Sequence, residues 1–519
     1  MAPNERSRLL PPPASTRVDD NAPEQNNSKV KRSAGLIVCA TFLGEFLASA
    51  DESLMISTYS AIASDFRSLP MGSFLLVAYN FGYCVASPVY GVLGDLFGKK
   101  NIMLWSYLSF MLGCIACGSS ASIQQLILAR ALAGMSGAGM VSLVSVIMTD
   151  IMPSEDVVMY RNYANMVNMV GRALGAPIGG FLTQTVGWRW SFFGQIPLVL
   201  ASILITAQQM PSSLNRPQHI ETSARSKLKH LDFAGIIVFA AAVLSLLLMV
   251  HNFDSVGLQQ SQLFFLTAGA FSLFTVMFLL VEIFWAVTPL IPLDLMKTSF
   301  GMYCVSQLLV TTGRSAFMPT TVPYFVRVHN ASDFEASLVN VIAMFGVPIG
   351  GFLTGLFIKR TNQHKKLGIM AASLMGVVYL VIFLRWRVGC HLWESLYLLP
   401  FGFTMGVLFS TQFIGMTSTV LKERLGQCVG TFYLFQQLGR IIGPVFGLKL
   451  IDQIFKQSLI DKLTSGPEKQ TLINNILNDA RFSFTLPTSM QRIASQSFLH
   501  GFQVVPCSVS FVLSSHYQS

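Results

Sequence analysis

Apolar residues in this 519-residue chain occur in long blocks, and the charged residues lie in the short segments between them. The blocks run for about 18–25 residues, which at 1.5 Å of rise per residue is long enough to cross a bilayer. Backbone groups in lipid must be hydrogen-bonded within the protein, so such blocks predict helices. The pattern therefore predicts an all-α polytopic membrane protein.

We expect fourteen spans, with both termini on one side of the membrane. The last span is short and contains Pro506, which leaves open whether it crosses or the C-terminus is truncated. The expected spans lie at about 34–60, 72–92, 102–121, 124–148, 162–184, 190–209, 231–251, 262–284, 300–326, 336–358, 367–384, 394–419, 427–451 and 499–514.

The spans divide the chain into four parts. Residues 1–32 are polar and rich in proline, so we expect a disordered cytosolic tail. A six-helix half at 33–210 precedes a basic loop and two extra helices at 211–298. A second six-helix half occupies 299–519 and includes a long, polar, non-cytoplasmic loop at 452–498.

Composition supports this reading. Only 12% of the residues are charged, against about 25% in soluble domains. The net charge of +10 does not indicate nucleic acid, because lysine and arginine form short clusters between apolar blocks. Those clusters recur in alternate loops, and the positive-inside rule assigns such loops to the cytosol.

Two pairs of similar segments indicate an internal repeat. Residues 91–100 (GVLGDLFGKK) resemble 351–360 (GFLTGLFIKR), and residues 171–179 (GRALGAPIG) resemble 439–447 (GRIIGPVFG). Repeats of this kind are typical of transporters. Glycines at such intervals also occur as simple helix-packing faces. The common offset favours two repeated halves with two extra helices between them.

Several of these residues carry a resemblance to a known family. The stretch at 91–100 resembles the signature loop of the major facilitator superfamily, although Leu96 replaces a basic residue; its matching positions are Gly91, Asp95, Gly98, Lys99 and Lys100. The surroundings of Arg130 resemble the buried-arginine motif of proton antiporters. Gly175, Pro177, Gly179 and Gly180 resemble the antiporter glycine–proline motif with the proline shifted by one, and Gly443 and Pro444 carry the unshifted form.

The resemblance implies the major facilitator fold with fourteen helices and proton-coupled antiport by alternating access. It implies that Asp95 closes the cytoplasmic side by contacting a helix end of the other half. Pro177 and Pro444 would bend their helices. Residues 50–59 and 77–80 look closest to fungal vacuolar basic amino acid transporters.

An ionisable side chain within the bilayer is costly, so it marks a candidate functional site. The first span holds Glu45, Asp51 and Glu52. Glu45 and Glu52 are seven residues apart and share a helix face, whereas Asp51 points about 100° from Glu52. Asp51 falls where the family has its first-helix aspartate, so it is our first candidate for the proton site. The alternative is that Asp51 or Glu52 is solvated near the membrane surface.

Arginines of the spans are the candidate partners of these acids. Arg130 cannot lose its proton and needs a partner or a water-filled cavity, although a buried ion pair that fixes packing would also satisfy it. Arg172 and Arg440 occupy equivalent repeat positions and would pair with the acids or line the cavity. Arg314 and Gln412 are further cavity candidates, and Glu282 is expected at the membrane interface.

The sequence gives no support for an enzyme function. There is no phosphate-binding GxxxxGK[ST] loop and no His/Glu pair with zinc-ligand spacing. Cys114 and Cys117 form a CxxC inside an apolar span without a second pair. We therefore expect no catalytic residue, metal or cofactor.

Two short motifs bear on location. Glu5, Leu9 and Leu10 fit an acidic dileucine sorting signal that an adaptor would read in the cytosolic tail. Asn330 opens an N-x-S glycosylation sequon on the non-cytoplasmic side. With the resemblance, the sorting signal favours a vacuolar membrane.

The sequence thus predicts a monomeric proton antiporter that moves small organic solutes, foremost basic amino acids, from cytosol into the vacuole. One alternative is a plasma-membrane efflux pump for drugs or secondary metabolites. Another is a nutrient sensor that keeps the fold but does not transport.

Overall fold

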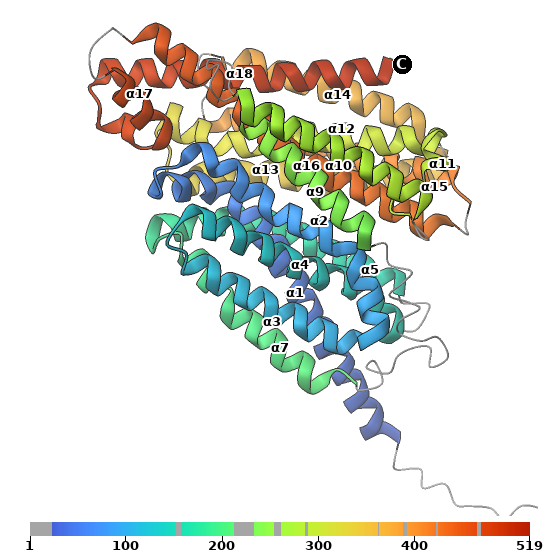
Figure 1. The fold of residues 1–519 in the computed structure, drawn as a ribbon. Coiled ribbons are helices and arrows are strands. Elements are labelled where there is room, and N and C mark those ends of the chain that lie inside the picture. Colours follow the sequence, from blue (N-terminus) through green and yellow to red (C-terminus); the bar gives the residue numbers. More distant parts are fainter. Residues whose placement is uncertain are drawn as a thin grey trace, which may run out of the picture.

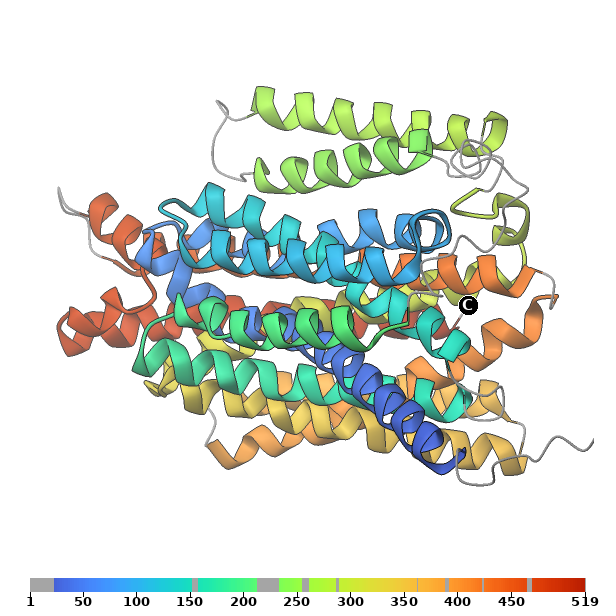
Figure 2. The same ribbon diagram turned by 90° about the horizontal axis from the view of Figure 1, so that it is seen from below.

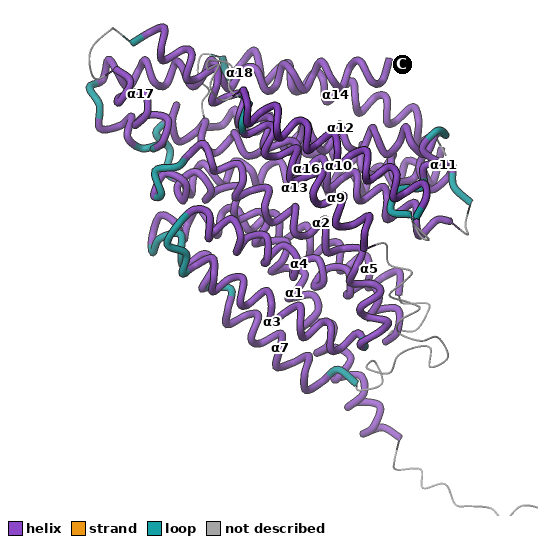
Figure 3. Tube along the Cα trace, viewed as in Figure 1, coloured by secondary structure: helices purple, strands orange, loops and turns teal. Residues whose placement is uncertain are grey.

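The computed structural model describes residues 23–151, 157–211, 233–253, 261–285, 289–361, 363–387, 392–421, 424–463 and 469–518. These residues form a bundle of long helices joined by short turns, and they contain no strand (Figures 1 and 3). Each of the fourteen predicted spans overlaps a helix; the sixth overlaps a consecutive helix pair, and the twelfth begins in a 3-10 turn before its helix.

The first half contains the helices drawn in blue to green in Figure 1. A 3-10 turn, η1 (Leu69–Met71), precedes its second long helix. The helices are α1 (Pro23–Asp65), α2 (Gly72–Phe97), α3 (Lys99–Gly118), α4 (Ile123–Ile151), α5 (Val157–Thr185), α6 (Trp190–Phe193) and α7 (Ile196–Gln209).

The second half contains the helices drawn in yellow to red. A short helix, α11 (Leu293–Met296), leads into it, and η4 (Leu392–Tyr397) and η6 (Phe482–Thr485) are 3-10 turns. The helices are α12 (Ser299–His329), α13 (Asp333–Thr361), α14 (His364–Arg385), α15 (Leu398–Thr419), α16 (Leu425–Lys462), α17 (Lys469–Asn478) and α18 (Thr488–Gln518).

The repeated glycine motifs pack in equivalent ways. Helix α5 packs on α1, and α16 packs on α12. A Cβ added at Gly175 would lie 2.2 Å from the Ala50 carbonyl oxygen, and one at Gly443 would lie 2.5 Å from the Thr312 carbonyl oxygen. Only glycine permits these close approaches.

Helices α9 (Phe233–His251) and α10 (Ser261–Phe284) are the two extra helices. They pack on each other, and α9 also contacts α2 and α16 at the outer edge of the bundle, where Figure 2 shows the pair lying outside the other helices. Phe239 and Val243 of α9 share an apolar cluster with Val77 of α2 and Ile441 of α16. The extra pair therefore covers one seam between the halves.

Nine helical stretches of the described residues are long and apolar enough to cross a membrane. Large apolar side chains such as Leu128, Phe265 and Phe352 are exposed on their outer faces, as contact with lipid requires. The nine stretches do not include α1, α5, α12, α16 or α18. The count of fourteen crossings therefore stays a prediction.

Two expected irregular segments are in fact partly helical. The expected tail at 1–32 gives way to helix at Pro23, where α1 begins. The expected loop at 452–498 contains the end of α16, all of α17 and the start of α18. Its helices form because Ile473 and Ile476, three residues apart, are both buried against the bundle. The last helix, α18, is longer than the expected span at 499–514.

Candidate functional site

The two halves are in close contact at the helix ends that are predicted to be non-cytoplasmic. The Tyr59 hydroxyl of α1 donates a hydrogen bond of 3.1 Å to the Pro319 carbonyl oxygen of α12. Phe181 of α5 and Phe334 of α13 lie edge to face, with ring centroids 5.9 Å apart. The gap between the two halves is therefore closed at this end of the bundle.

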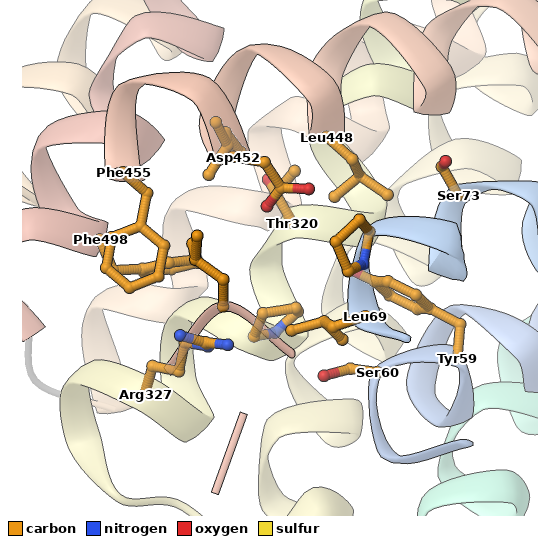
Figure 4. A pocket seen from close by; sticks show the side chains of 14 residues that line it. Tyr59, Ser60, Leu69, Ser73, Thr320, Arg327, Leu448, Asp452, Phe455 and Phe498 are labelled. Carbon is orange, nitrogen blue, oxygen red and sulfur yellow. The ribbon is translucent and has the colours of Figure 1, made fainter. Parts of the chain in front are cut away.

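A pocket of about 30 Å³, room for about two waters, remains in this closed end (Figure 4). Asp452 of α16 and Arg327 of α12, both just beyond the predicted spans, line it together with Tyr59. Burial raises the pKa of Asp452 to about 6, although the charges of Arg327 and Lys449 oppose that change. Burial lowers the pKa of Arg327 to about 10, because it disfavours the charged guanidinium, and the negative charge of Asp452 opposes this change.

The halves separate toward the other end, which is predicted to face the cytosol. A cavity of about 640 Å³ lies there between α1, α2, α4 and α5 of the first half and α12, α13, α15 and α16 of the second. A smaller central cavity of about 70 Å³ adjoins it and shares Arg172, Arg314, Met344 and Arg440 as lining residues. The larger volume lies within the usual range of small-molecule sites.

Glu52 lies in the central cavity between arginines of the two halves. Its Oε2 is 2.9 Å from Nη2 of Arg172, and its Oε1 is 3.2 Å from Nη1 of Arg440. The Glu52 side chain keeps 17% of its surface exposed. The two repeat-related arginines thus meet on one carboxylate, which lies in the gap between the halves.

Glu45 lines the larger cavity, and Glu52 lines the adjoining central cavity. The two acids therefore lie on the same face of α1, as predicted. The residue is 4% exposed, and its Oε2 has no hydrogen-bond partner among the described residues. Asn168 of α5 lies beside the carboxyl. A buried polar atom without a protein partner is uncommon, which makes Glu45 a candidate for binding a proton or a ligand.

Asp51 points away from the cavities, into the first half. Its Oδ2 is 2.5 Å from Nη1 of Arg130 on α4, and Gln195 donates to its Oδ1 at 3.0 Å. The side chains of Asp51 and Arg130 are each 1% exposed. The Arg130 guanidinium also lies 4.8 Å from the ring centroid of Tyr79. Surface solvation of Asp51 is therefore excluded, and neither residue of the pair lines the two cavities.

The remaining polar candidates are Arg314, Gln412 and Glu282, and each has different surroundings. Arg314 lines both cavities, as expected. Gln412 does not line them, because it is buried and donates to the Ser306 hydroxyl at 2.8 Å. Glu282 is buried, and the backbone N–H groups of Leu290 and Ile291 donate to its Oε1. Its position at the membrane interface stays a prediction.

The signature loop forms a one-residue turn between α2 and α3. Gly98 has φ +87°, a conformation that favours glycine. Lys100 donates to the carbonyl oxygens of Ala207 and Met210 at the end of α7, which is a favourable place for a cation. Lys99 is buried. The side chains of Asp95 and of Val92, next to Gly91, lie outside the described residues. The gating contact of Asp95 therefore stays a prediction.

The location motifs are only partly described. Glu5, Leu9 and Leu10 lie outside the described residues. Asn330 is exposed, has φ +53° and ends α12, so its side chain is accessible at the predicted non-cytoplasmic end. Glycosylation of Asn330 stays a prediction.

Three site residues escaped the sequence reasoning. Gln195 and Asn168 are neutral polar residues inside spans, and nothing in their spacing distinguishes them from helix-packing residues. Asp452 directly follows a predicted span, where an acid is expected to be solvated. Only the tertiary contacts bring them to Asp51, Glu45 and the closed end.

Comparison with known proteins agrees with this architecture. Residues 41–444 match the Major Facilitator Superfamily. Among solved structures, the chain is similar to a bacterial homologue of the human lysosomal transporter Spinster, with a TM-score of 0.62 at 15% identity over 93% of this chain and 95% of that one. It is also similar to a D-xylose–proton symporter, with a TM-score of 0.56 at 11% identity over 86% and 95% of the two chains.

Three curated relatives cover nearly the whole chain. The vacuolar membrane amino acid uptake transporter fnx2 of Schizosaccharomyces pombe is 25% identical over 96% of this chain and 87% of its own length. Vacuolar basic amino acid transporter 1 of Saccharomyces cerevisiae is 24% identical over 96% and 90%. The multidrug resistance protein fnx1 of S. pombe is 26% identical over 92% and 91%. This chain is therefore a multi-pass membrane protein that belongs to the major facilitator superfamily, a family of transporters and not of enzymes.

Proposed function

We propose that the protein is a proton-coupled antiporter that moves basic amino acids from the cytosol into the vacuole by alternating access. The observation that carries this proposal is the pair of carboxyl groups, Glu45 and Glu52, on the cavity-facing side of α1. The names of two relatives, both vacuolar amino acid transporters, support the cargo and the compartment.

In this mechanism Glu45 is the group that exchanges protons. Its unpartnered Oε2 lies in a cavity that ends toward the cytosol, so the carboxylate can release a proton there and bind a cationic group in its place. When the cavity opens to an acidic lumen, a proton displaces the cation. Proton and substrate then use one carboxyl in turn, which couples their opposite movements.

Glu52, Arg172 and Arg440 link this exchange to the movement of the two halves. Arg172 belongs to the first half and Arg440 to the second, and both are held by Glu52. The Asp51–Arg130 pair holds α1 against α4, so it positions the acids rather than contacting the substrate. The cytosolic closing contact of Asp95 belongs to the opposite state of the cycle.

Uptake into vesicles tests the proposal. Vesicles with the full-length protein and an acidic interior should accumulate radiolabelled L-lysine or L-arginine, and a protonophore should abolish the accumulation. Glu45→Gln should lower uptake at least tenfold, because a neutral amide neither exchanges a proton nor attracts a cation. Asp294→Asn is the matched control, since Asp294 is an exposed acid that is paired with Arg424 and does not line either cavity. Normal uptake by Glu45→Gln would contradict the proton role of this residue.

A drug-efflux function is the second candidate, because the relative fnx1 is named a multidrug resistance protein. A tagged protein at the plasma membrane, together with drug resistance and no proton-driven amino acid uptake, would favour it. Location at the vacuole with amino acid uptake would exclude it.

A further inference from the structure

The charges that line the two adjoining cavities do not balance. The described lining residues include Arg172, Arg314 and Arg440 as cations, and only Glu45 and Glu52 as acids. With both acids ionised, the site keeps one positive charge in excess. A site built only to hold a cation would carry the opposite excess, because like charges repel at close distance.

Arg314 is the one of these three arginines that has no carboxylate partner among the described residues. Arg172 and Arg440 are both within 3.2 Å of Glu52, but no carboxylate lies within ion-pair distance of Arg314 among the described residues. Its Nη2 contacts the Met344 sulfur at 3.4 Å, and its guanidinium carbon is 5.8 Å from the ring centroid of Phe409. A thioether is a weak acceptor, and a guanidinium carries five N–H donors. Most of the hydrogen-bonding capacity of Arg314 is therefore unused.

We infer that Arg314 binds the carboxylate of the transported solute. An Arg–carboxylate pair is commonly bidentate, and it would satisfy donors that have no protein acceptor. One unpaired guanidinium matches one carboxylate better than a doubly charged phosphate. This inference rests on the proposed function, in which the solute is an amino acid.

The same cavity offers a partner for the other end of such a solute. Glu45 lines the larger cavity together with Arg314, and its Oε2 is unpartnered. A solute with a carboxylate at Arg314 and an ammonium group toward Glu45 would neutralise both residues. A cation without a carboxylate would leave Arg314 unsatisfied and would be repelled by the arginines. The site therefore selects amino acids over cationic amines and drugs of similar size.

Three ligands that differ by one group test this selectivity. L-lysine has both groups, cadaverine is lysine without its carboxylate, and 6-aminohexanoate is lysine without its α-amino group. Binding to the purified full-length protein would be measured by calorimetry. L-lysine and 6-aminohexanoate should bind, and cadaverine should bind at least tenfold more weakly. Cadaverine binding as tightly as L-lysine, or no binding of either carboxylate ligand, would overturn the inference.

Variants localise the effect. Arg314→Gln should weaken L-lysine binding at least tenfold and leave the weak binding of cadaverine unchanged or stronger. Arg314→Lys keeps the charge without the planar fork and should restore binding in part. Arg424→Gln, which removes an exposed arginine outside the cavities, should bind L-lysine as the unaltered protein does. Unchanged L-lysine binding by a folded Arg314→Gln protein would overturn the inference.

Binding and transport distinguish this inference from the proposed function. Selective binding of the carboxylate ligands without proton-driven uptake would support the Arg314 site and contradict antiport. Proton-driven uptake of cadaverine and L-lysine at equal rates would support antiport and overturn the Arg314 site.

Discussion

Asp51 and Glu52 are adjacent on α1, yet their carboxylates have opposite surroundings. Asp51 is 1% exposed and bonded to Arg130 and Gln195 within the first half. Glu52 is 17% exposed and lies between Arg172 and Arg440, one from each half. Successive residues of a helix point about 100° apart, so Asp51 faces a buried ion pair within one half while Glu52 faces contacts to both halves. The contacts of Glu52 must break when the halves move.

The difference teaches how one helix serves two purposes. A dry ion pair has no water to replace a lost partner, so it holds α1 and α4 at a fixed distance. The carboxylate in the cavity can be solvated, so its arginines can separate at lower cost. We therefore expect the Asp51 pair to matter most for stability, and the carboxylates that line the cavities to matter most for the proposed transport.

Breaking the sealed pair should have the largest effect on stability. Asp51→Asn leaves Arg130 buried and charged, and we expect the free energy of unfolding to fall by about 3–5 kcal/mol. Thermal unfolding of the purified protein would show a large fall in Tm, and vacuolar uptake would fall with it. In the double variant Asp51→Asn with Arg130→Gln, the loss should be smaller than the sum of the two single losses. An unchanged Tm in Asp51→Asn would show that water reaches this pair.

Removing the neighbouring carboxylate should separate function from stability. Glu52→Gln should lower uptake at least tenfold, because Arg172 and Arg440 then repel each other across the gap between the halves. Its Tm should fall much less than that of Asp51→Asn, since the cavity allows both arginines to be hydrated. Equal falls in Tm for the two variants would contradict the contrast between these sites.

The repeat predicts a symmetric but smaller response. Arg172→Gln and Arg440→Gln should each lower uptake several-fold, because Glu52 keeps one arginine in either variant. The two losses should be similar, as expected of equivalent positions in the two halves. Uptake that falls in one variant only would show that Glu52 belongs functionally to one half. The kinetics of L-lysine uptake would be measured in vesicles with equal amounts of each protein.

The helices and the repeat were predictable from the sequence because apolar length and glycine spacing are local properties. The shared face of Glu45 and Glu52 was predictable from helix geometry alone. The roles within that site were not, because they depend on what each helix face meets. Asp51, our first candidate for the proton, faces α4 and pairs with Arg130. Arg314, a minor candidate, lines both cavities and has no carboxylate partner among the residues that the structure describes.

The helices within the segment at 452–498 were not predicted, for a different reason. Its polar composition is typical of a loop, and the apolar residues that it does bury against the bundle, such as Phe455, Ile473 and Phe498, are widely spaced. The contact that orders it is tertiary, since the backbone N–H of Ala480 donates to the Ser64 hydroxyl of α1 at 3.0 Å. Asp452 is the first residue of this segment, so its burial was missed as well.

Asp452 extends the comparison to an acid outside the spans, where the smallest effect is expected. Burial raises its pKa to about 6 from an ordinary value of 3.8, so the folded protein holds the proton more tightly than the unfolded chain. Its contribution to stability is therefore greatest below about pH 4 and is lost as the pH rises to about 6. Asp452→Asn should remove this part of the pH dependence, so that the Tm of the variant changes less between pH 4 and 6 than that of the unaltered protein. Glu335→Gln, at an exposed acid near the start of α13, is the matched control. A pH profile that is the same with and without Asp452 would show that the closed end is open to water, and that this acid resembles Glu52 rather than Asp51.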